Sequence, residues 1–177
     1  MILLISGASH TGKTVLAQKL MERIGYPYLS IDHLKMGLIR SGQTSLKPDS
    51  PDSALVDYLW PIVREIVKTA IENGQNLIVE GCYIPFDWKN SFDKTYLARI
   101  RYLCLVMDEV YLREHWEEIR SRANDIERRQ DDSSFTQEIA AKENRYFLSG
   151  CLENGLNYLF FNKESLVDPG LEMFLSR

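Results

Sequence analysis

The sequence is short of several features that mark whole classes of protein. It contains only three cysteines, Cys82, Cys104 and Cys151, at spacings typical of neither a metal site nor a disulfide framework. No apolar run approaches the roughly 18 residues that a membrane-spanning helix needs. The opening MILLIS is apolar, but it is short and has no basic lead-in, so we expect no secretory signal. These absences predict a cytoplasmic protein with reduced thiols.

Basic residues are neither abundant nor clustered. The chain has 21 Lys and Arg against 25 Asp and Glu, which gives a formal net charge of −4. Its most basic stretch, residues 120–129, is interleaved with acidic residues. A nucleic-acid or membrane surface would need a dense block of positive charge. The sequence therefore favours a small-molecule partner, with no nucleic acid and no membrane, and it gives no indication of the oligomeric state.

Apolar runs alternate with amphipathic segments along the 177 residues, a length that fits one domain. We expect strands at residues 2–6, 28–31, 76–79, 100–107 and 158–161. We expect helices at residues 13–24, 32–40, 51–71, 86–94, 109–129, 136–152 and 169–175. Pro61 should kink or split the third helix. Unbroken apolar strands between helices predict an α/β fold, with helices on both faces of a five-stranded parallel sheet.

Three polar positions directly follow predicted strands: the segment that begins at Gly7, Asp32 and Glu80. The carboxyl ends of parallel strands meet at one edge of the sheet, where ligands of open α/β folds bind. We therefore expect these three positions to converge on one site.

The first of these positions opens the segment GASHTGKT, which matches the phosphate-binding pattern G-x-x-x-x-G-K-[ST] between a strand and a helix. Its backbone N–H groups and the following helix N-terminus would cradle phosphates. Lys13 would reach the β- and γ-phosphates of ATP, and the Thr14 hydroxyl would bind Mg²⁺. The expected nucleotide-binding residues are Gly7, Ala8, Ser9, His10, Thr11, Gly12, Lys13 and Thr14.

The phosphate-binding segment, the chain length and the strand–helix alternation resemble the small P-loop kinases related to nucleoside monophosphate kinases. SIDHLKMG (residues 30–37) and NLIVEG (residues 76–81) are similar to the zeta-toxin and chloramphenicol-phosphotransferase branch. The N-terminal half also resembles bacterial proteins labelled adenylate kinase or 2-phosphoglycerate kinase. The resemblance implies a three-layer P-loop NTPase fold in a single domain over residues 1–177, with a helical lid at about residues 109–135.

Asp32 matches the aspartate that, in this kinase branch, accepts the proton of the acceptor hydroxyl. The alternative is that Asp32 only caps the helix from His33. Glu80 would hold Mg²⁺ or a substrate hydroxyl, and the alternative is a helix cap or a structural salt bridge. Lys35 could touch substrate, although an exposed helix lysine is the more ordinary interpretation.

Arginines of the lid would screen the charge that develops on the transferred phosphate. If residues 109–129 form one helix, Arg122 and Arg129 lie one heptad apart on one flank, and we take them as the lid pair. Arg145 on the next helix is a further substrate-binding candidate. The alternative is a solvated face of Glu–Arg pairs.

Together these features predict an ATP- and Mg²⁺-dependent phosphotransferase that moves the γ-phosphate to a small-molecule hydroxyl, with Lys13, Asp32 and the lid arginines as catalytic residues. A nucleotide kinase resembling adenylate kinase is one alternative, and a non-transferring ATP-binding switch or adaptor is another. A regulatory GTPase is disfavoured because the sequence contains no strong DxxG switch motif.

Overall fold

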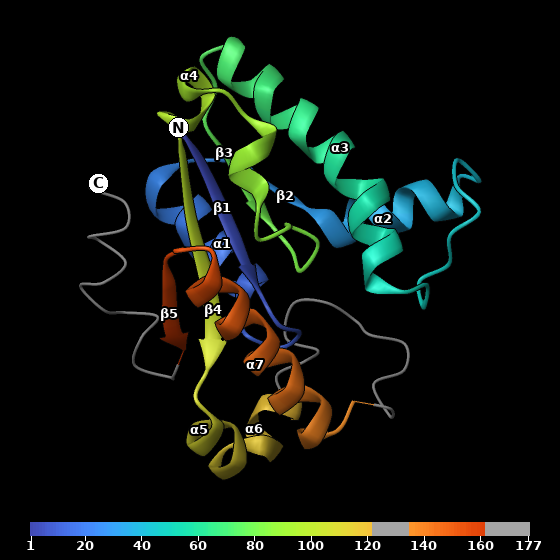
Figure 1. Cartoon of the computed structure of the whole chain (residues 1–177), viewed down its shortest axis with the longest axis vertical. Coiled ribbons are helices and arrows are strands. Elements are labelled where there is room, and N and C mark those ends of the chain that lie inside the picture. The colour runs from blue at the N-terminus through green and yellow to red at the C-terminus, as the bar shows by residue number, and fades with distance from the viewer. Residues whose placement is uncertain (122–134, 162–177) are drawn as a thin grey trace.

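The computed structural model describes residues 1–121 and 135–161. Its centre is a five-stranded sheet in which every paired strand is parallel, with the order β2-β3-β1-β4-β5 (Figure 1). The strands are β1 (Ile2–Gly7), β2 (Tyr28–Ser30), β3 (Leu77–Glu80), β4 (Ile100–Met107) and β5 (Tyr158–Phe161). The predicted five-stranded parallel sheet is therefore confirmed. The helix predicted at residues 169–175 lies outside the described residues.

The strand β1 is central because its unbroken apolar sequence can be buried on both faces. It pairs with β3 on one side and with β4 on the other, and all six of its residues are buried. Its register places Ile5 beside Glu80, and that of β2 places Ser30 beside the same glutamate. The first three strands in the chain therefore end at one edge, which is the expected position for a ligand site.

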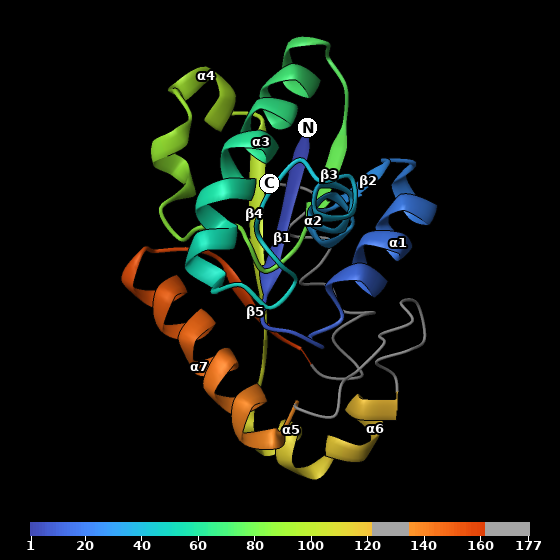
Figure 2. The same ribbon diagram turned by 90° about the vertical axis from the view of Figure 1, so that its right-hand side faces the viewer.

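Helices cover both faces of this sheet (Figure 2). The helix α1 (Lys13–Ile24) packs Leu16, Ala17 and Leu20 on one face. The other face is covered by α3 (Asp52–Glu72) and α7 (Gln137–Glu153), while α2 (Ile31–Arg40) follows the edge strand β2. These layers are the predicted three-layer α/β fold. Pro61 lies inside α3, which continues as one helix, so the predicted split does not occur.

The region predicted as a helix at residues 86–94 is shorter and broken. It contains a 3₁₀ helix, η1 (Trp88–Ser91), followed by α4 (Lys94–Leu97). The Asp93 side chain accepts hydrogen bonds from the N–H groups of Thr95 and Tyr96, so it caps the start of a new helix. Because of this cap, the helix α4 begins at Lys94, where the sequence had predicted the end of a helix.

The helix expected over residues 109–129 is also interrupted. It forms α5 (Glu109–Glu114) and α6 (Trp116–Ser121), and residues 122–129 lie outside the described part of the chain. His115 leaves the helical conformation with φ of −112°, and its ring stacks on Tyr111 at a centroid distance of 4.4 Å. The assumption of one continuous helix, on which we assigned flanks to the arginines, is therefore wrong.

The helix α5 lies beyond the carboxyl end of β4 next to the lower end of α7, and α6 follows on the far side of α5 (Figures 1 and 2). They occupy the first part of the predicted lid range.

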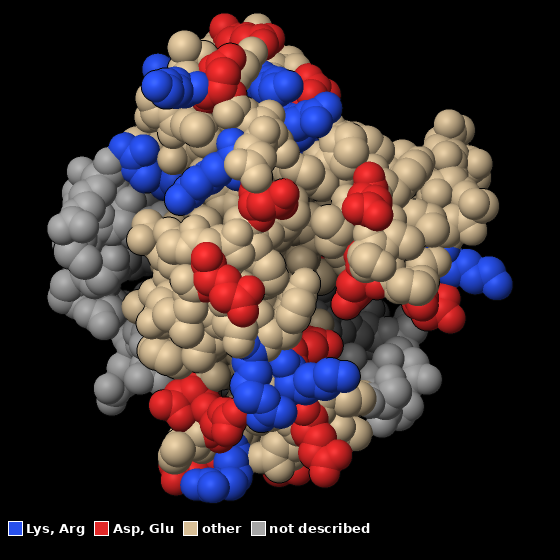
Figure 3. Space-filling view, viewed as in Figure 1, with Lys and Arg blue, Asp and Glu red and all other residues tan. Residues whose placement is uncertain are grey.

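On the face drawn in Figure 3, acidic and basic side chains are interleaved. Among the described helices, none combines the length and the apolar character needed to cross a membrane.

Candidate active site

The segment between β1 and α1 forms a compact loop around its own backbone. Three of its residues have positive φ angles, with values of 140° at Gly7, 63° at His10 and 82° at Gly12. Such angles turn successive peptide groups so that their N–H groups can line a concavity, and glycine reaches them at little cost. Because α1 begins at Lys13, its positive end faces the same concavity.

Two side chains brace this loop from inside. The Thr11 hydroxyl donates to the Ala8 carbonyl at 2.9 Å, and Thr11 is fully buried. The Lys13 ammonium donates to the same carbonyl at 2.7 Å, and only 8% of Lys13 is exposed. The lysine is thus folded onto the loop itself, where it can exchange a neutral carbonyl for a phosphate oxygen. Thr14 follows at the first turn of α1 and is half-buried.

Gly7 can be tested directly, because a side chain has no room there. A Cβ atom at this position would overlap the carbonyl oxygen of Leu105 on the neighbouring strand, and the φ angle of 140° disfavours any other residue. We expect Gly7→Ala to destabilise the protein by about 1–3 kcal/mol and to weaken ATP binding, as measured by thermal unfolding and calorimetry. Gly37→Ala is the matched control, since a Cβ there meets nothing within 4 Å. Equal melting temperatures for the two variants would contradict this account.

A carboxylate from a distant helix already contacts the loop. The Ser9 backbone N–H donates to Glu143 Oε2 on α7 at 3.2 Å. The next residue, Asn144, fixes this helix, because its Oδ1 accepts the Met107 backbone N–H at 2.7 Å at the end of β4. The loop therefore presents a backbone N–H group to an anionic oxygen, that of Glu143. This is the chemistry that a phosphate-binding cradle requires.

Glu143 and a bound nucleotide would compete for this edge of the loop. Replacing Glu143 by glutamine removes one negative charge but keeps the size of the side chain. We expect Glu143→Gln to tighten ATP binding about three- to tenfold at low ionic strength, since one local charge–charge term is worth on the order of 1 kcal/mol. Titration calorimetry measures this, with the exposed Glu153→Gln on the same helix as control. Weaker ATP binding by Glu143→Gln would instead make Glu143 part of the nucleotide or metal site.

Asp32 lies in the first turn of α2 and faces a lysine of the same helix. The helix starts at Ile31 with Ser30 as its N-cap residue, so the interpretation of Asp32 as the cap is wrong. Asp32 Oδ1 instead accepts a hydrogen bond from Lys35 Nζ at 2.7 Å. The Asp32 side chain is 37% exposed and the Lys35 side chain 11%. The expectation of a solvated lysine at position 35 is also wrong.

Glu80 is the last residue of β3 and is 1% exposed. An acidic side chain is costly to bury unless it is paired or close to a cation. The sequence prediction that Glu80 and Thr14 hold Mg²⁺, directly or through water and together with phosphate oxygens, stays a prediction. Within residues 1–121 and 135–161, no group of three or more His, Cys, Asp or Glu side chains is arranged to hold a metal ion alone.

Cys82 lies two residues after the end of β3, in the segment that follows Glu80. Burial raises the pKa of Cys82 to about 12, with a further contribution from the negative charge of Asp32. The charges of Lys13 and Lys35 act on the same thiol in the opposite direction. The strand register brings the three segments to the same edge of the sheet, because Ile5 of β1 and Ser30 of β2 both lie beside Glu80 of β3.

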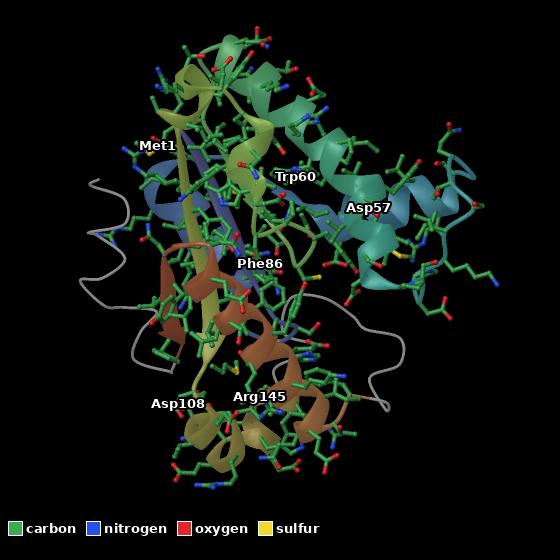
Figure 4. The ribbon with its side chains drawn as sticks, viewed as in Figure 1. Met1, Asp57, Trp60, Phe86, Asp108 and Arg145 are labelled. Carbon is green, nitrogen blue, oxygen red and sulfur yellow. The ribbon has the colours of Figure 1, made fainter. Side chains whose placement is uncertain are left out.

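The predicted lid arginines, Arg122 and Arg129, lie outside the described residues. Arg145 on α7 is described and points towards α5 (Figure 4), where its Nη1 lies 2.7 Å from Glu109 Oε1. Both side chains are more than half exposed, at 59% and 60%. An exposed pair of this kind contributes little to stability, so Arg145 could leave it to meet a substrate.

Sequence reasoning missed three contributors to this edge: the buried position of Lys35, its contact with Tyr83, and Glu143. The spacing of Asp32 and Lys35 by three residues was a usable signal, because such residues are neighbours on a helix. Tyr83 and Glu143 gave no local signal. Their partners lie 48 and 134 residues away along the chain.

Comparisons with known proteins identify the fold of this chain but do not identify a substrate. No protein-family model matches the sequence, and no curated protein matches it. Solved structures do match, and those compared below share the P-loop kinase fold.

One similar structure is a deoxyadenosine kinase from M. mycoides, with a TM-score of 0.57, 12% identity and coverage of 100% of both chains. A sugar kinase from Janibacter sp. has a TM-score of 0.54 and 15% identity, over 99% of this chain and 94% of that one. A shikimate kinase from Aquifex aeolicus has a TM-score of 0.53 and 15% identity, over 99% and 96%. These identities establish a shared fold alone.

Proposed function

We propose that this chain is an ATP- and Mg²⁺-dependent phosphotransferase that moves the γ-phosphate to a hydroxyl group of a small molecule. The observation that carries the proposal is the common edge of the sheet: β1 leads into the loop that holds Lys13, β2 leads into Asp32, and the register places Ile5 and Ser30 on either side of Glu80. A cation held on a phosphate loop and a partly exposed carboxylate beside it are the two groups that such a transfer needs.

The described residues divide the chemistry between donor and acceptor. Mg²⁺, when bound, would neutralise charge on the β- and γ-phosphates, and Thr14 and Glu80 would hold it. Lys13 would bind the β- and γ-phosphate oxygens in place of the Ala8 carbonyl. Asp32 would accept the proton of the acceptor hydroxyl as its oxygen bonds to the γ-phosphorus. The bond to the β–γ bridging oxygen then breaks, and ADP leaves with that electron pair.

The charge around Asp32 supports a hydroxyl acceptor over a phosphate acceptor. Within residues 1–121 and 135–161, Lys35 is the cation that contacts Asp32, and this pairing compensates the charge of Asp32. An acceptor phosphate would need uncompensated cations close to the reacting oxygen, and it would not need a base. The names of the fold neighbours include kinases of a nucleoside, of a sugar and of shikimate, so a hydroxyl acceptor is consistent with the fold.

Acceptor-dependent release of ADP tests the proposal. The purified protein would be given ATP and Mg²⁺ with separate pools of neutral alcohols, nucleosides, sugars, nucleotides and phosphorylated acids. We expect ADP release above the ATP-only rate with a pool of hydroxyl acceptors, and loss of the signal with EDTA. Stimulation only by nucleoside monophosphates would identify a nucleotide kinase. Tight ATP binding with no stimulation by any pool would favour a non-transferring switch.

A further inference from the structure

One lysine on the acceptor side of this site has an unusual environment. Lys35 is 9% exposed, although lysine is almost never buried unless it is paired. Its ammonium group donates to Asp32 Oδ1 at 2.7 Å and to the Tyr83 hydroxyl at 2.8 Å. Removing a charged ammonium from water is costly, and these two bonds offset part of that cost.

Tyr83 holds this lysine from a different element. It lies three residues after the end of β3, and only 5% of it is exposed. The Lys35 nitrogen is 4.8 Å from the ring centroid but 2.8 Å from the hydroxyl, so the contact is a hydrogen bond to the oxygen. Burial raises the pKa of Tyr83, so its hydroxyl stays neutral. The lysine is thus held between α2 and the segment after β3.

This arrangement gives the two carboxylate oxygens of Asp32 different surroundings. Oδ1 is bound by Lys35, whereas Oδ2 accepts no hydrogen bond from the described residues, and the side chain keeps 37% of its exposure. We infer that Lys35, held by Tyr83, is a positioning residue that orients the Asp32 carboxylate so that Oδ2 faces the acceptor hydroxyl. The inference rests on the proposed function, because Asp32 must act on an acceptor.

The pair also defines the kind of acceptor. An isolated carboxylate beside the reacting hydroxyl would add to the negative charge of the phosphates, and Lys35 cancels that addition locally. A neutral alcohol fits this compensated environment, since it brings no charge of its own, and its proton passes to Asp32 as its oxygen bonds to the γ-phosphorus. The acceptor class that follows is an uncharged polyol, sugar or nucleoside hydroxyl, reacting next to Asp32.

A double-mutant cycle tests the positioning role. Lys35→Met keeps the aliphatic stem and removes the ammonium. We expect it to lower kcat by about 10- to 100-fold, as a misplaced catalytic group does, while the acceptor KM and the ATP Kd change less than about threefold. In an Asp32→Asn background the same substitution should cause no further loss, because Lys35 acts through Asp32. Lys35→Arg should recover part of the rate, and the exposed Lys47→Met is the matched control.

The Tyr83→Phe variant keeps the ring and removes only the hydroxyl, so it tests the inference even if Lys35→Met does not fold. A smaller loss of kcat in this variant, again absent in the Asp32→Asn background, supports the inference. Independent, multiplicative losses in the two backgrounds would overturn it, as would an unchanged kcat for both variants of an active protein. Absence of transfer by the wild-type protein is a distinct result, since it refutes the proposed function itself.

Discussion

Replacing Lys13 by methionine is expected to reduce kcat/KM for ATP by about 100- to 1,000-fold, the usual cost of losing one preorganised charge donor in a transferase site. Lys13 is 8% exposed, and its ammonium group is held 2.7 Å from the Ala8 carbonyl, so it stands within the loop. Methionine fills a similar volume but cannot donate to the phosphate oxygens. Steady-state kinetics and titration calorimetry together separate the effect on turnover from the effect on binding.

A lysine on the same helix provides the control for this experiment. Lys19 lies on α1 and is exposed, so Lys19→Met changes the net charge equally without touching the loop. It should retain the kcat/KM of the wild-type protein and a similar melting temperature. If both variants lost activity equally, the result would reflect charge or stability in general, and the phosphate-binding role of Lys13 would be wrong.

Replacing Asp32 by asparagine is expected to lower kcat by about 100- to 10,000-fold with a hydroxyl acceptor, which is the range for loss of a general base. Asparagine keeps the shape of the side chain but cannot take the proton. ATP affinity should stay within about threefold, because Asp32 is proposed to meet the acceptor and not the loop. Single-turnover kinetics with saturating ATP report the chemical step.

The same substitution separates the two kinds of kinase. A nucleotide kinase needs no base at the acceptor phosphate, so Asp32→Asn would lower its kcat by less than about tenfold. Asp57→Asn is a suitable control, because Asp57 is an exposed aspartate on α3 (Figure 4). A small effect at Asp32 with an alcohol as the confirmed acceptor would show that another group accepts the proton.

The sequence was informative wherever local pattern decides structure. The loop between β1 and α1 was located from eight consecutive residues, Gly7 to Thr14, between a buried strand and a helix, and its phosphate-binding role stays a prediction. The convergence of Gly7, Asp32 and Glu80 followed from one rule, that parallel strands end at a common edge. The strand order was not predicted, because parallel pairing is set by tertiary packing and leaves no mark in the apolar runs.

Other features were predicted wrongly or not at all, because they depend on tertiary contacts or leave no trace in the hydrophobic periodicity. Lys35 was expected in solvent, yet Tyr83 from 48 residues away buries it. The contact of Glu143 with Ser9 spans 134 residues. No proline or glycine marks the helix break at His115 in the sequence. The His115 ring stacks on Tyr111 at this break. The lid arginines stay a prediction, since Arg122 and Arg129 lie outside the described part of the chain.

Transfer of label from γ-labelled ATP to a hydroxyl acceptor is the most direct test of the central claim. The wild-type protein and Lys13→Ala would be incubated with Mg²⁺ and the acceptor pool that stimulates ADP release, and labelled products would be separated and identified. The account predicts a labelled phosphate ester formed in proportion to ADP and absent with Lys13→Ala. Label found only as inorganic phosphate, or an ester formed equally by Lys13→Ala, would contradict it.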